Sequence, residues 1–270
     1  MPDGALPTPE QLAALLRPRL TGVVDVDTRR RAEYSTDASN YRVVPTAVAF
    51  PRSVDDVLAA LEVCREHGVP LTMRGGGTSV AGNAVGTGLV LDTSRHLAGV
   101  WSVDPEARTA VVEPGAVLDD LQRAAAPYGL RFGPDPSTHA RCTLGGMIAN
   151  NACGPHALSA GRTVDQVLGL DVVTGTGQRL AAGPGTTAAV PGVEELVARS
   201  LATIRTEFAT FGRQASGYAL EHLPPERGRD LAKALVGSEG TCAVVLGATL
   251  RLVEAPAATA LAVLGYADLA

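Results

Sequence analysis

The pattern that most clearly indicates a chemical role in this chain is a run of three consecutive glycines. Residues 74–84 read RGGGTSVAGNA and follow a short apolar segment, 69–73, that predicts a buried strand. Glycine tolerates positive φ, so a loop over 75–79 can turn successive N–H groups toward one point and bind an anion without a lysine. The sequence therefore predicts a phosphate-binding loop at the end of a strand. An ordinary glycine-rich turn is the alternative.

Two common phosphate-binding patterns do not describe this loop. A Walker loop requires GxxxxGK followed by serine or threonine; Gly77 and Gly82 have that spacing, but Asn83 stands in place of the lysine. A dinucleotide-binding GxGxxG pattern that begins at Gly75 fails because Val80 replaces its third glycine. Neither pattern therefore identifies the ligand.

The other reactive side chains form weaker patterns. His139 is the best candidate for a base, and a loop histidine without a catalytic role is the alternative. Arg141 and Arg162 are candidates for holding an anion, with solvated surface arginines as the alternative. Arg74 either contacts a phosphate or anchors the strand end. The cysteines contain no CxxC pair, so we expect buried thiols and no metal site. They are Cys64, Cys142, Cys153 and Cys242.

The composition is that of a folded protein with no general attraction to nucleic acid. Of 270 residues, 46% are hydrophobic and 19% are charged, and the net charge is −5. An acidic chain does not attract nucleic acid or an anionic membrane. No apolar run approaches about 18 residues, and the opening residues MPDGALPTPEQ lack a signal-peptide pattern. We therefore expect a cytoplasmic protein without a membrane span.

A strand–helix–strand unit is predicted to position the glycine loop. Residues 43–50 predict a strand. Residues 53–67 predict a helix because apolar side chains recur at helical spacing, Ser53 suits its N-cap, and Gly68 ends it. The strand over 69–73 follows directly. We expect it to run parallel to the first strand and to place the loop at its carboxyl end, the edge where ligands bind in α/β folds.

The rest of the chain predicts further strands and helices around one irregular segment. Residues 131–163 show no clear periodicity, and a long irregular segment in a compact domain is usually functional or disordered; its content indicates function. A strand that begins after residue 254 would lack a partner, which indicates missing sequence. The other predicted elements are strands at 88–92, 98–103 and 108–115, helix 116–126, hairpin 168–180, helix 193–208, a helix ending near 237, and a strand pair over 238–254.

Three segments together carry a family signature. They are RGGGTSVAG at 74–82, GPDPSTHARCTLGGMIANNACG at 133–154 and LVGSEGTCAVVLGATLRL at 235–252, and TDASNYR stands at 36–42. They resemble the flavin domain of the vanillyl-alcohol-oxidase (PCMH-type) superfamily. The similarity is greatest to the N-terminal flavin domain of bacterial FAD and iron–sulfur D-lactate, glycolate and D-2-hydroxyglutarate dehydrogenases.

The resemblance implies an α+β fold, the PCMH-type FAD-binding fold of two α/β lobes with FAD between them. It implies an N-terminal helical segment at 1–29 and a FAD-binding domain at 30–255, with lobes at about 30–95 and 96–255. Residues 256–270 would begin a missing C-terminal cap domain that holds most substrate-binding groups. Electrons would pass to an iron–sulfur acceptor on missing sequence or on another chain.

The resemblance also implies roles for individual residues. The loop amides would cradle the FAD pyrophosphate, and Val172 would bind the adenine edge through its main chain. Covalent flavoproteins of the superfamily carry histidine where this chain has Thr78, so a non-covalent FAD is expected. The residues implied to contact FAD are Arg74, Gly75, Gly76, Gly77, Thr78, Ser79, Pro136, Ser137, Thr138, Leu144, Gly145, Gly146, Asn150, Asn151, Gly154, Val172, Glu239 and Gly240.

The implied reaction is hydride transfer from the α-carbon of a D-2-hydroxy acid to flavin N5, with His139 as the in-chain candidate for the base. Two alternatives stay open. One is a flavoenzyme like the UDP-N-acetylenolpyruvylglucosamine reductases, which LGGMIANNACG partly matches, although TDASNYR and GSEGT argue against it. The other is a non-enzymatic module that holds FAD and needs a cap domain and an electron-accepting partner.

Overall fold

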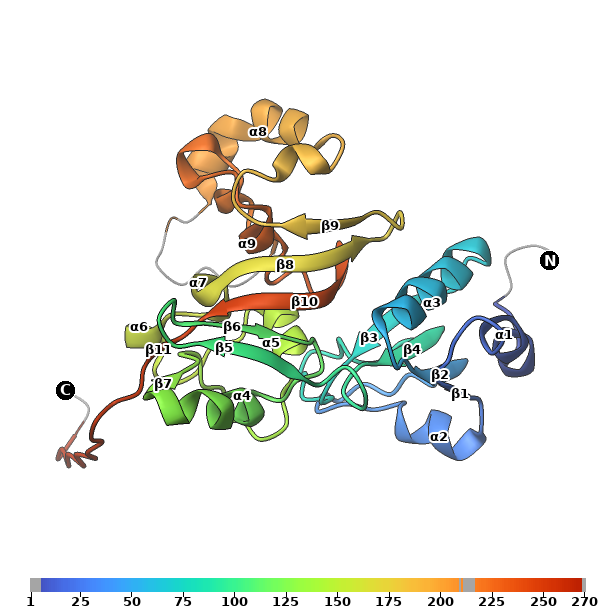
Figure 1. Cartoon of the computed structure of the whole chain (residues 1–270), viewed down its shortest axis with the longest axis horizontal. Coiled ribbons are helices and arrows are strands. Elements are labelled where there is room, and N and C mark those ends of the chain that lie inside the picture. Colours follow the sequence, from blue (N-terminus) through green and yellow to red (C-terminus); the bar gives the residue numbers. More distant parts are fainter. Residues whose placement is uncertain (1–5, 209, 211–216, 269–270) are drawn as a thin grey trace.

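The protein folds around two main β-sheets, one in each of two lobes. The structure, a computed structural model, describes residues 6–208, 210 and 217–268. In Figure 1 the four-stranded sheet lies on the right with α1 to α3, and the five-stranded sheet lies on the left. The four-stranded sheet has the strand order β1-β2-β4-β3, the five-stranded sheet has the order β5-β6-β10-β8-β9, and β11 pairs with β7.

The first lobe contains the predicted strand–helix–strand unit. β2 and β3 each run parallel to β4, which lies between them. β2 and β3 are therefore parallel, as predicted, but they are not neighbours, because the fully buried β4 takes the central position. The elements of this lobe are α1 (Pro9–Leu16), β1 (Val23–Asp25), α2 (Thr28–Glu33), β2 (Ala47–Phe50), α3 (Val54–Glu66), β3 (Leu71–Arg74) and β4 (Leu89–Asp92).

The start of α3 ties the N-terminal residues to this lobe. The Ser53 hydroxyl caps α3 by accepting from the Asp56 N–H (3.2 Å). The buried Asp56 carboxylate accepts from the N–H groups of Thr21 (2.7 Å), Gly22 (3.0 Å) and Arg52 (2.8 Å). β1 pairs antiparallel with β2, so part of the segment 1–29 shares the first sheet. The proposed division of the chain into domains stays a prediction.

The second lobe is an antiparallel sheet with short helices. β10 is its central strand and pairs with both β6 and β8. The elements are β5 (Val100–Asp104), β6 (Thr109–Val112), α4 (Leu118–Ala125), β7 (Leu130–Arg131), α5 (Leu144–Asn150), α6 (Ala157–Ala160), α7 (Thr163–Gln166), β8 (Val167–Thr174), β9 (Arg179–Ala182), α8 (Val193–Glu207), α9 (Leu231–Leu235), β10 (Ala243–Arg251) and β11 (Val253–Glu254).

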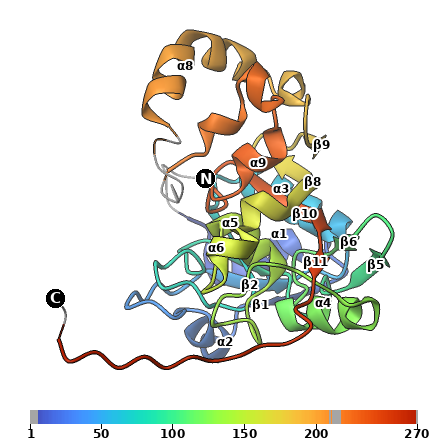
Figure 2. The ribbon, with the colours of Figure 1, turned by 90° about the vertical axis from the view of Figure 1, so that its left-hand side faces the viewer.

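Three sequence expectations were wrong in this lobe. The strand pair expected over 238–254 is not a pair, because β10 and β11 find partners elsewhere: β6 and β8 for the first, β7 for the second. The segment 131–163 contains two short helices, α5 and α6, and α7 begins at its last residue. The described residues after 254 form no strand and run as an extended, exposed segment, red in Figure 2.

The two lobes share a hydrophobic core at their junction. Val173, Val244 and Leu246 of the five-stranded sheet join the core that contains α1, α3, β2 and β4. A second core lies within the five-stranded lobe, around α4 and α5. Because side chains of one lobe complete the core of the other, the walls between them have a fixed relative position. Within the part of the chain that the structure describes, no helix is long and apolar enough to cross a membrane.

Candidate functional site

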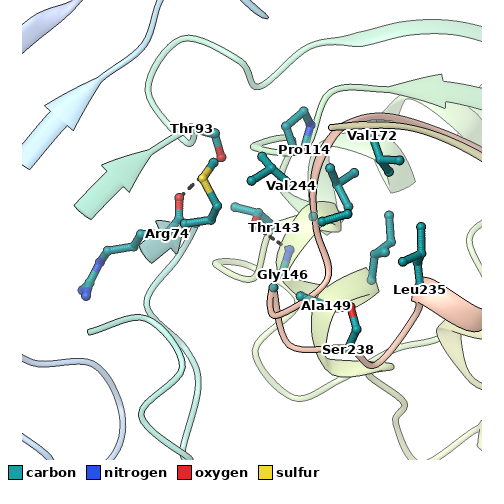
Figure 3. Close-up of a pocket in the computed structure, with 17 residues that line it drawn as sticks. Arg74, Thr93, Pro114, Thr143, Gly146, Ala149, Val172, Leu235, Ser238 and Val244 are labelled. Carbon is teal, nitrogen blue, oxygen red and sulfur yellow. Dashed lines mark hydrogen bonds between the residues drawn. The ribbon is translucent and has the colours of Figure 1, made fainter. Parts of the chain in front are cut away.

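A cleft of about 490 Å³ is lined by residues of both lobes. The loop that follows β3 forms one wall, and α5 with the GSEGT turn (237–241) forms the other. A smaller cavity of about 80 Å³ continues from it, and Figure 3 shows its walls. The residues that line both spaces are Met73, Gly75, Thr143, Gly146, Ala149 and Gly240.

The first two glycines of the loop are required by the protein itself. A Cβ at Gly75 would overlap the Thr143 hydroxyl, and a Cβ at Gly76 would overlap the Arg141 carbonyl. Gly77 adopts a φ of 63°. The glycine cluster was interpreted as a sign that backbone closely approaches a ligand. The structure shows that it first closely approaches the segment ahead of α5.

The same loop has unpaired donors. In the residues that the structure describes, the N–H groups of residues 75–79 donate to no protein acceptor. Residues 75–79 line the cleft, so these five successive donors are free to bind an acceptor-rich ligand there. The anion-binding loop predicted from the sequence has the donors it needs.

Arg74 shapes this loop from behind. Its guanidinium donates to the carbonyls of Ala84 (2.9 Å) and Thr36 (3.0 Å) and lies 4.9 Å from the centre of the Tyr34 ring. In Figure 3 the guanidinium points away from the other pocket residues. Two carbonyls and a ring already engage Arg74, as the anchoring alternative requires. The phosphate contact is the less favoured of the two roles.

The TDASNYR segment supports the loop from the other side. The Ala38 N–H donates to the Gly77 carbonyl (3.1 Å), and the Ala84 N–H donates to the Asp37 carboxylate (3.3 Å). Burial alone would raise the pKa of Asp37, but hydrogen bonds from Ser39 and Ala84 outweigh it and hold that pKa below its usual value. The sequence identified this segment only as a family signature; its contacts show that it positions the glycine loop.

Tyr34 completes the support beneath Arg74. Its hydroxyl donates to the Asp92 carboxylate (2.6 Å) at the end of β4. Burial and this hydrogen bond raise the pKa of Tyr34 well above its usual value, so the phenol stays protonated. A neutral ring under a guanidinium makes a cation–π contact that holds the arginine in place.

Most residues that the sequence predicted to contact FAD line the cleft or the smaller cavity. Thr143 was not among them, although it caps α5 by accepting from the Gly146 N–H (3.3 Å), dashed in Figure 3. A threonine directly before an apolar helix is an N-cap signal that the glycines in LGGM obscured. The predicted residues that line the two spaces are Arg74, Gly75, Gly76, Gly77, Thr78, Ser79, Pro136, Thr138, Gly145, Gly146, Asn150, Val172, Glu239 and Gly240.

Four predicted cofactor residues lie outside these walls. The Leu144 side chain is buried in the core of the second lobe. Asn151 ends α5 in the left-handed conformation, and its side-chain oxygen accepts from the Val164 N–H (3.0 Å). Gly154 has no room for a side chain because it packs on the Asp135 carbonyl. Ser137 is exposed and does not line either space.

His139 does not line the cleft either. Its Nδ1 lies 2.8 Å from the Asp119 carboxylate at the start of α4, and its side chain is 55% exposed. This position fits the alternative of a loop histidine without a catalytic role. Cys142 does line the cleft, but burial raises the pKa of its thiol, which keeps it protonated and unreactive. Among the described residues, no group of three or more side chains could hold a metal ion.

The chain belongs to the family of FAD binding domains. Residues 45–183, just over half of its length, match that family. The fold agrees with the expected PCMH-type arrangement: alkyldihydroxyacetonephosphate synthase superposes on 96% of this chain and 42% of its own, with a TM-score of 0.67. At 19% identity this likeness concerns the fold alone.

Curated relatives are similar in sequence over most of the chain. D-2-hydroxyglutarate dehydrogenase of Pseudomonas putida is 36% identical over 92% of this chain. Glycolate oxidase subunit GlcD of Bacillus subtilis is 34% identical over 84%, and D-lactate dehydrogenase of Archaeoglobus fulgidus is 34% identical over 81%. The chain spans 26%, 41% and 42% of the lengths of these relatives, respectively.

The residues of the cleft fit FAD. The unpaired amides of the glycine loop match the acceptor oxygens of a pyrophosphate. On the opposite wall, a Cβ at Gly240 would meet no protein atom within 4 Å, and one at Gly146 would meet only the Thr143 hydroxyl, at 3.3 Å. Both glycines therefore leave open space where a side chain would intrude, which is the shape that a bound cofactor requires.

Proposed function

We propose that this chain is the FAD-holding part of an oxidoreductase that oxidises a D-2-hydroxy acid of the lactate, glycolate or 2-hydroxyglutarate type. One observation carries the cofactor part of the proposal: five unpaired amides line an interlobe cleft in a FAD binding domain. The names of the relatives support the substrate class.

In this proposal the two walls of the cleft bind different parts of FAD. The amides of residues 75–79 hold the pyrophosphate, while Arg74 and Tyr34 keep that loop in shape. Val172, with its strand partner Val245, gives the smaller cavity an apolar wall for the adenine end. FAD, when bound, accepts the hydride that leaves the α-carbon of the hydroxy acid.

A second candidate, a module that holds FAD without activity of its own, is favoured by the scarcity of charged residues in the cleft. Among the described residues that line the two spaces, Arg74 and Glu239 alone carry a charge, and Arg74 is engaged by carbonyls. Oxidation of a hydroxy acid needs a base for the hydroxyl proton and a cation for the carboxylate. We propose that a cap domain supplies these groups and that an iron–sulfur centre accepts the electrons, both outside this chain.

An FAD titration followed by anaerobic reduction tests both candidates. We expect the purified chain to take up FAD, to show flavin absorption near ~450 nm (a general property of flavins), and to release the yellow colour on acid precipitation because Thr78 offers no covalent link. Failure to take up FAD would overturn the proposal, and colour that stays in the pellet would overturn non-covalent binding.

Reduction of the bound flavin separates enzyme from module. D-lactate, D-2-hydroxyglutarate and glycolate are added without oxygen, with L-lactate as the matched control. Bleaching by a D-acid or by glycolate, but not by L-lactate, would favour a chain that is active by itself. Bound flavin that no hydroxy acid reduces would favour the module, and reduction by NADPH would favour the reductase alternative.

We also propose a cytoplasmic location. None of the four cysteines forms a disulfide in the structure, as in proteins of a reducing compartment. Cell fractionation of the full-length protein tests this location.

A further inference from the structure

The cleft wall formed by the GSEGT turn has an unfavourable backbone conformation. Gly237, Glu239 and Gly240 have φ values of 84°, 54° and 74°, respectively. Glycine adopts such angles readily, but glutamate does so at a cost, and a conformation of this kind persists where the surrounding structure enforces it. Because residues 239–241 line the cleft, the contacts that enforce the turn also determine the shape of the cleft.

Backbone hydrogen bonds to α5 hold the first part of the turn. The Gly237 N–H donates to the Ile148 carbonyl, and the Glu239 N–H donates to the Ala149 carbonyl, each at 2.9 Å. Both acceptors lie near the end of α5. These bonds leave the last two residues of the turn, which line the cleft, to other contacts.

A chain of hydroxyl groups holds the last residue of the turn. The Thr241 hydroxyl lies 2.6 Å from the Ser238 carbonyl, and the Tyr218 hydroxyl lies 2.9 Å from the Thr241 hydroxyl oxygen. A carbonyl can only accept, so the single proton of the Thr241 hydroxyl is donated to Ser238. Tyr218 is therefore the donor to Thr241. The three groups form a directed chain that runs from Tyr218 into the turn.

Tyr218 is itself fixed to the elements that precede the turn. Its carbonyl accepts from the Leu220 N–H (3.0 Å) at the start of the short helix η3 (Leu220–His222), and the last carbonyl of η3 accepts from the Asp230 N–H (2.9 Å). Asp230 caps α9, which leads directly into the turn. The segment from Tyr218 to Thr241 is therefore a closed loop, and the two hydroxyl groups tie its ends together beside the cleft.

We infer that Tyr218 is a positioning residue that, through Thr241, holds the GSEGT turn in the shape that FAD binding requires. This inference rests on the proposed function and adds a residue that lines neither the cleft nor the smaller cavity. Without the bond from Tyr218, the turn has fewer contacts to offset the cost of its left-handed conformation. A cleft whose wall has the binding shape for only part of the time binds FAD correspondingly more weakly.

Tyr218→Phe removes only the phenol oxygen and tests this role. We expect the Kd for FAD to rise by about threefold to tenfold, as the loss of one hydrogen bond allows. The bond is exposed and local, so the melting temperature of the FAD-free protein should fall by less than about 3 °C. Tyr128→Phe is the matched control, because Tyr128 is 53% exposed, against 50% for Tyr218, and does not line the cleft. Its FAD affinity should equal that of the wild type.

A double-mutant cycle separates positioning from a general effect of the tyrosine. Thr241→Val removes the acceptor for Tyr218 and keeps the shape of the side chain. In that background Tyr218→Phe should cause no further loss of FAD affinity, because no bond is left to remove. Thr241→Ser keeps the hydroxyl, so in that background Tyr218→Phe should weaken FAD binding as it does in the wild type.

Affinity is measured by flavin fluorescence quenching and stability by thermal unfolding without FAD. A loss of affinity in Tyr218→Phe that disappears in the Thr241→Val background supports the inference. Wild-type affinity in Tyr218→Phe, or an equal loss in both backgrounds, overturns it while the proposed function stands. A wild-type chain that takes up no FAD overturns the proposed function and this inference together.

Discussion

The two walls of the cleft are built on different principles. The wall from the first lobe is a glycine loop held by polar side chains: Arg74, Asp37 and, beneath them, Tyr34 on Asp92. The wall from the second lobe is a helix end and a turn, fixed by backbone hydrogen bonds and packed on an apolar core. Glycine therefore has a different structural role in each wall. In the first wall, Gly75 and Gly76 let two protein segments meet; in the second, Gly146 and Gly240 leave room for the ligand.

The largest effect is expected where a glycine serves protein packing. In Gly76→Ala the new methyl group would overlap the Arg141 carbonyl, a backbone atom that cannot rotate away. We expect a loss of unfolding free energy of about 3 kcal/mol or more, with loss of FAD binding, because the loop must leave its place. Thermal unfolding and FAD titration measure both. Gly175→Ala is the control, since a Cβ there would meet nothing within 4 Å. A stable Gly76→Ala protein would show that the loop packs elsewhere.

This distinction also explains what the sequence could predict. The strand–helix–strand unit and the glycine loop follow from local patterns of apolar residues and turn residues, and both were found. The supports of the loop were missed because the pairing of Asp37 with the Ala84 N–H depends on contact between distant segments. α5 was missed because two glycines in LGGM interrupt its periodicity. β10 was misjudged because its partners, β6 and β8, are distant in sequence.

A smaller effect is expected from the buried charge that ties the first lobe together. Burial alone would raise the pKa of Asp56, but hydrogen bonds from the Arg52, Thr21 and Gly22 backbone outweigh it and hold that pKa below its usual value. A lowered folded-state pKa gives stability that is full above the unfolded value of about 4 and is lost as the pH falls through the folded value. Asp56→Asn should cost about 2–3 kcal/mol at pH 7.

The pH dependence tests this account of Asp56 directly. The stability difference between wild type and Asp56→Asn should narrow as the pH falls below about 4, because the wild-type carboxyl becomes protonated. Denaturant unfolding between pH 7 and pH 3 measures it. Asp55→Asn is the matched control, one residue away on the same helix turn but exposed. A difference that stays constant with pH would mean that packing, not ionisation, accounts for the role of Asp56.

The smallest effect is expected from a glycine that serves the ligand. In Gly146→Ala the methyl group meets only the Thr143 hydroxyl, at 3.3 Å, and alanine favours a helix, so stability should change by less than about 1 kcal/mol. FAD affinity should still fall by about tenfold, because the methyl group enters the space that the cofactor needs. The pair Gly76→Ala and Gly146→Ala thus compares the two walls: one substitution should cost stability and binding, the other binding alone. Equal losses of stability would contradict the distinction, because the second wall would then also depend on its glycine for packing.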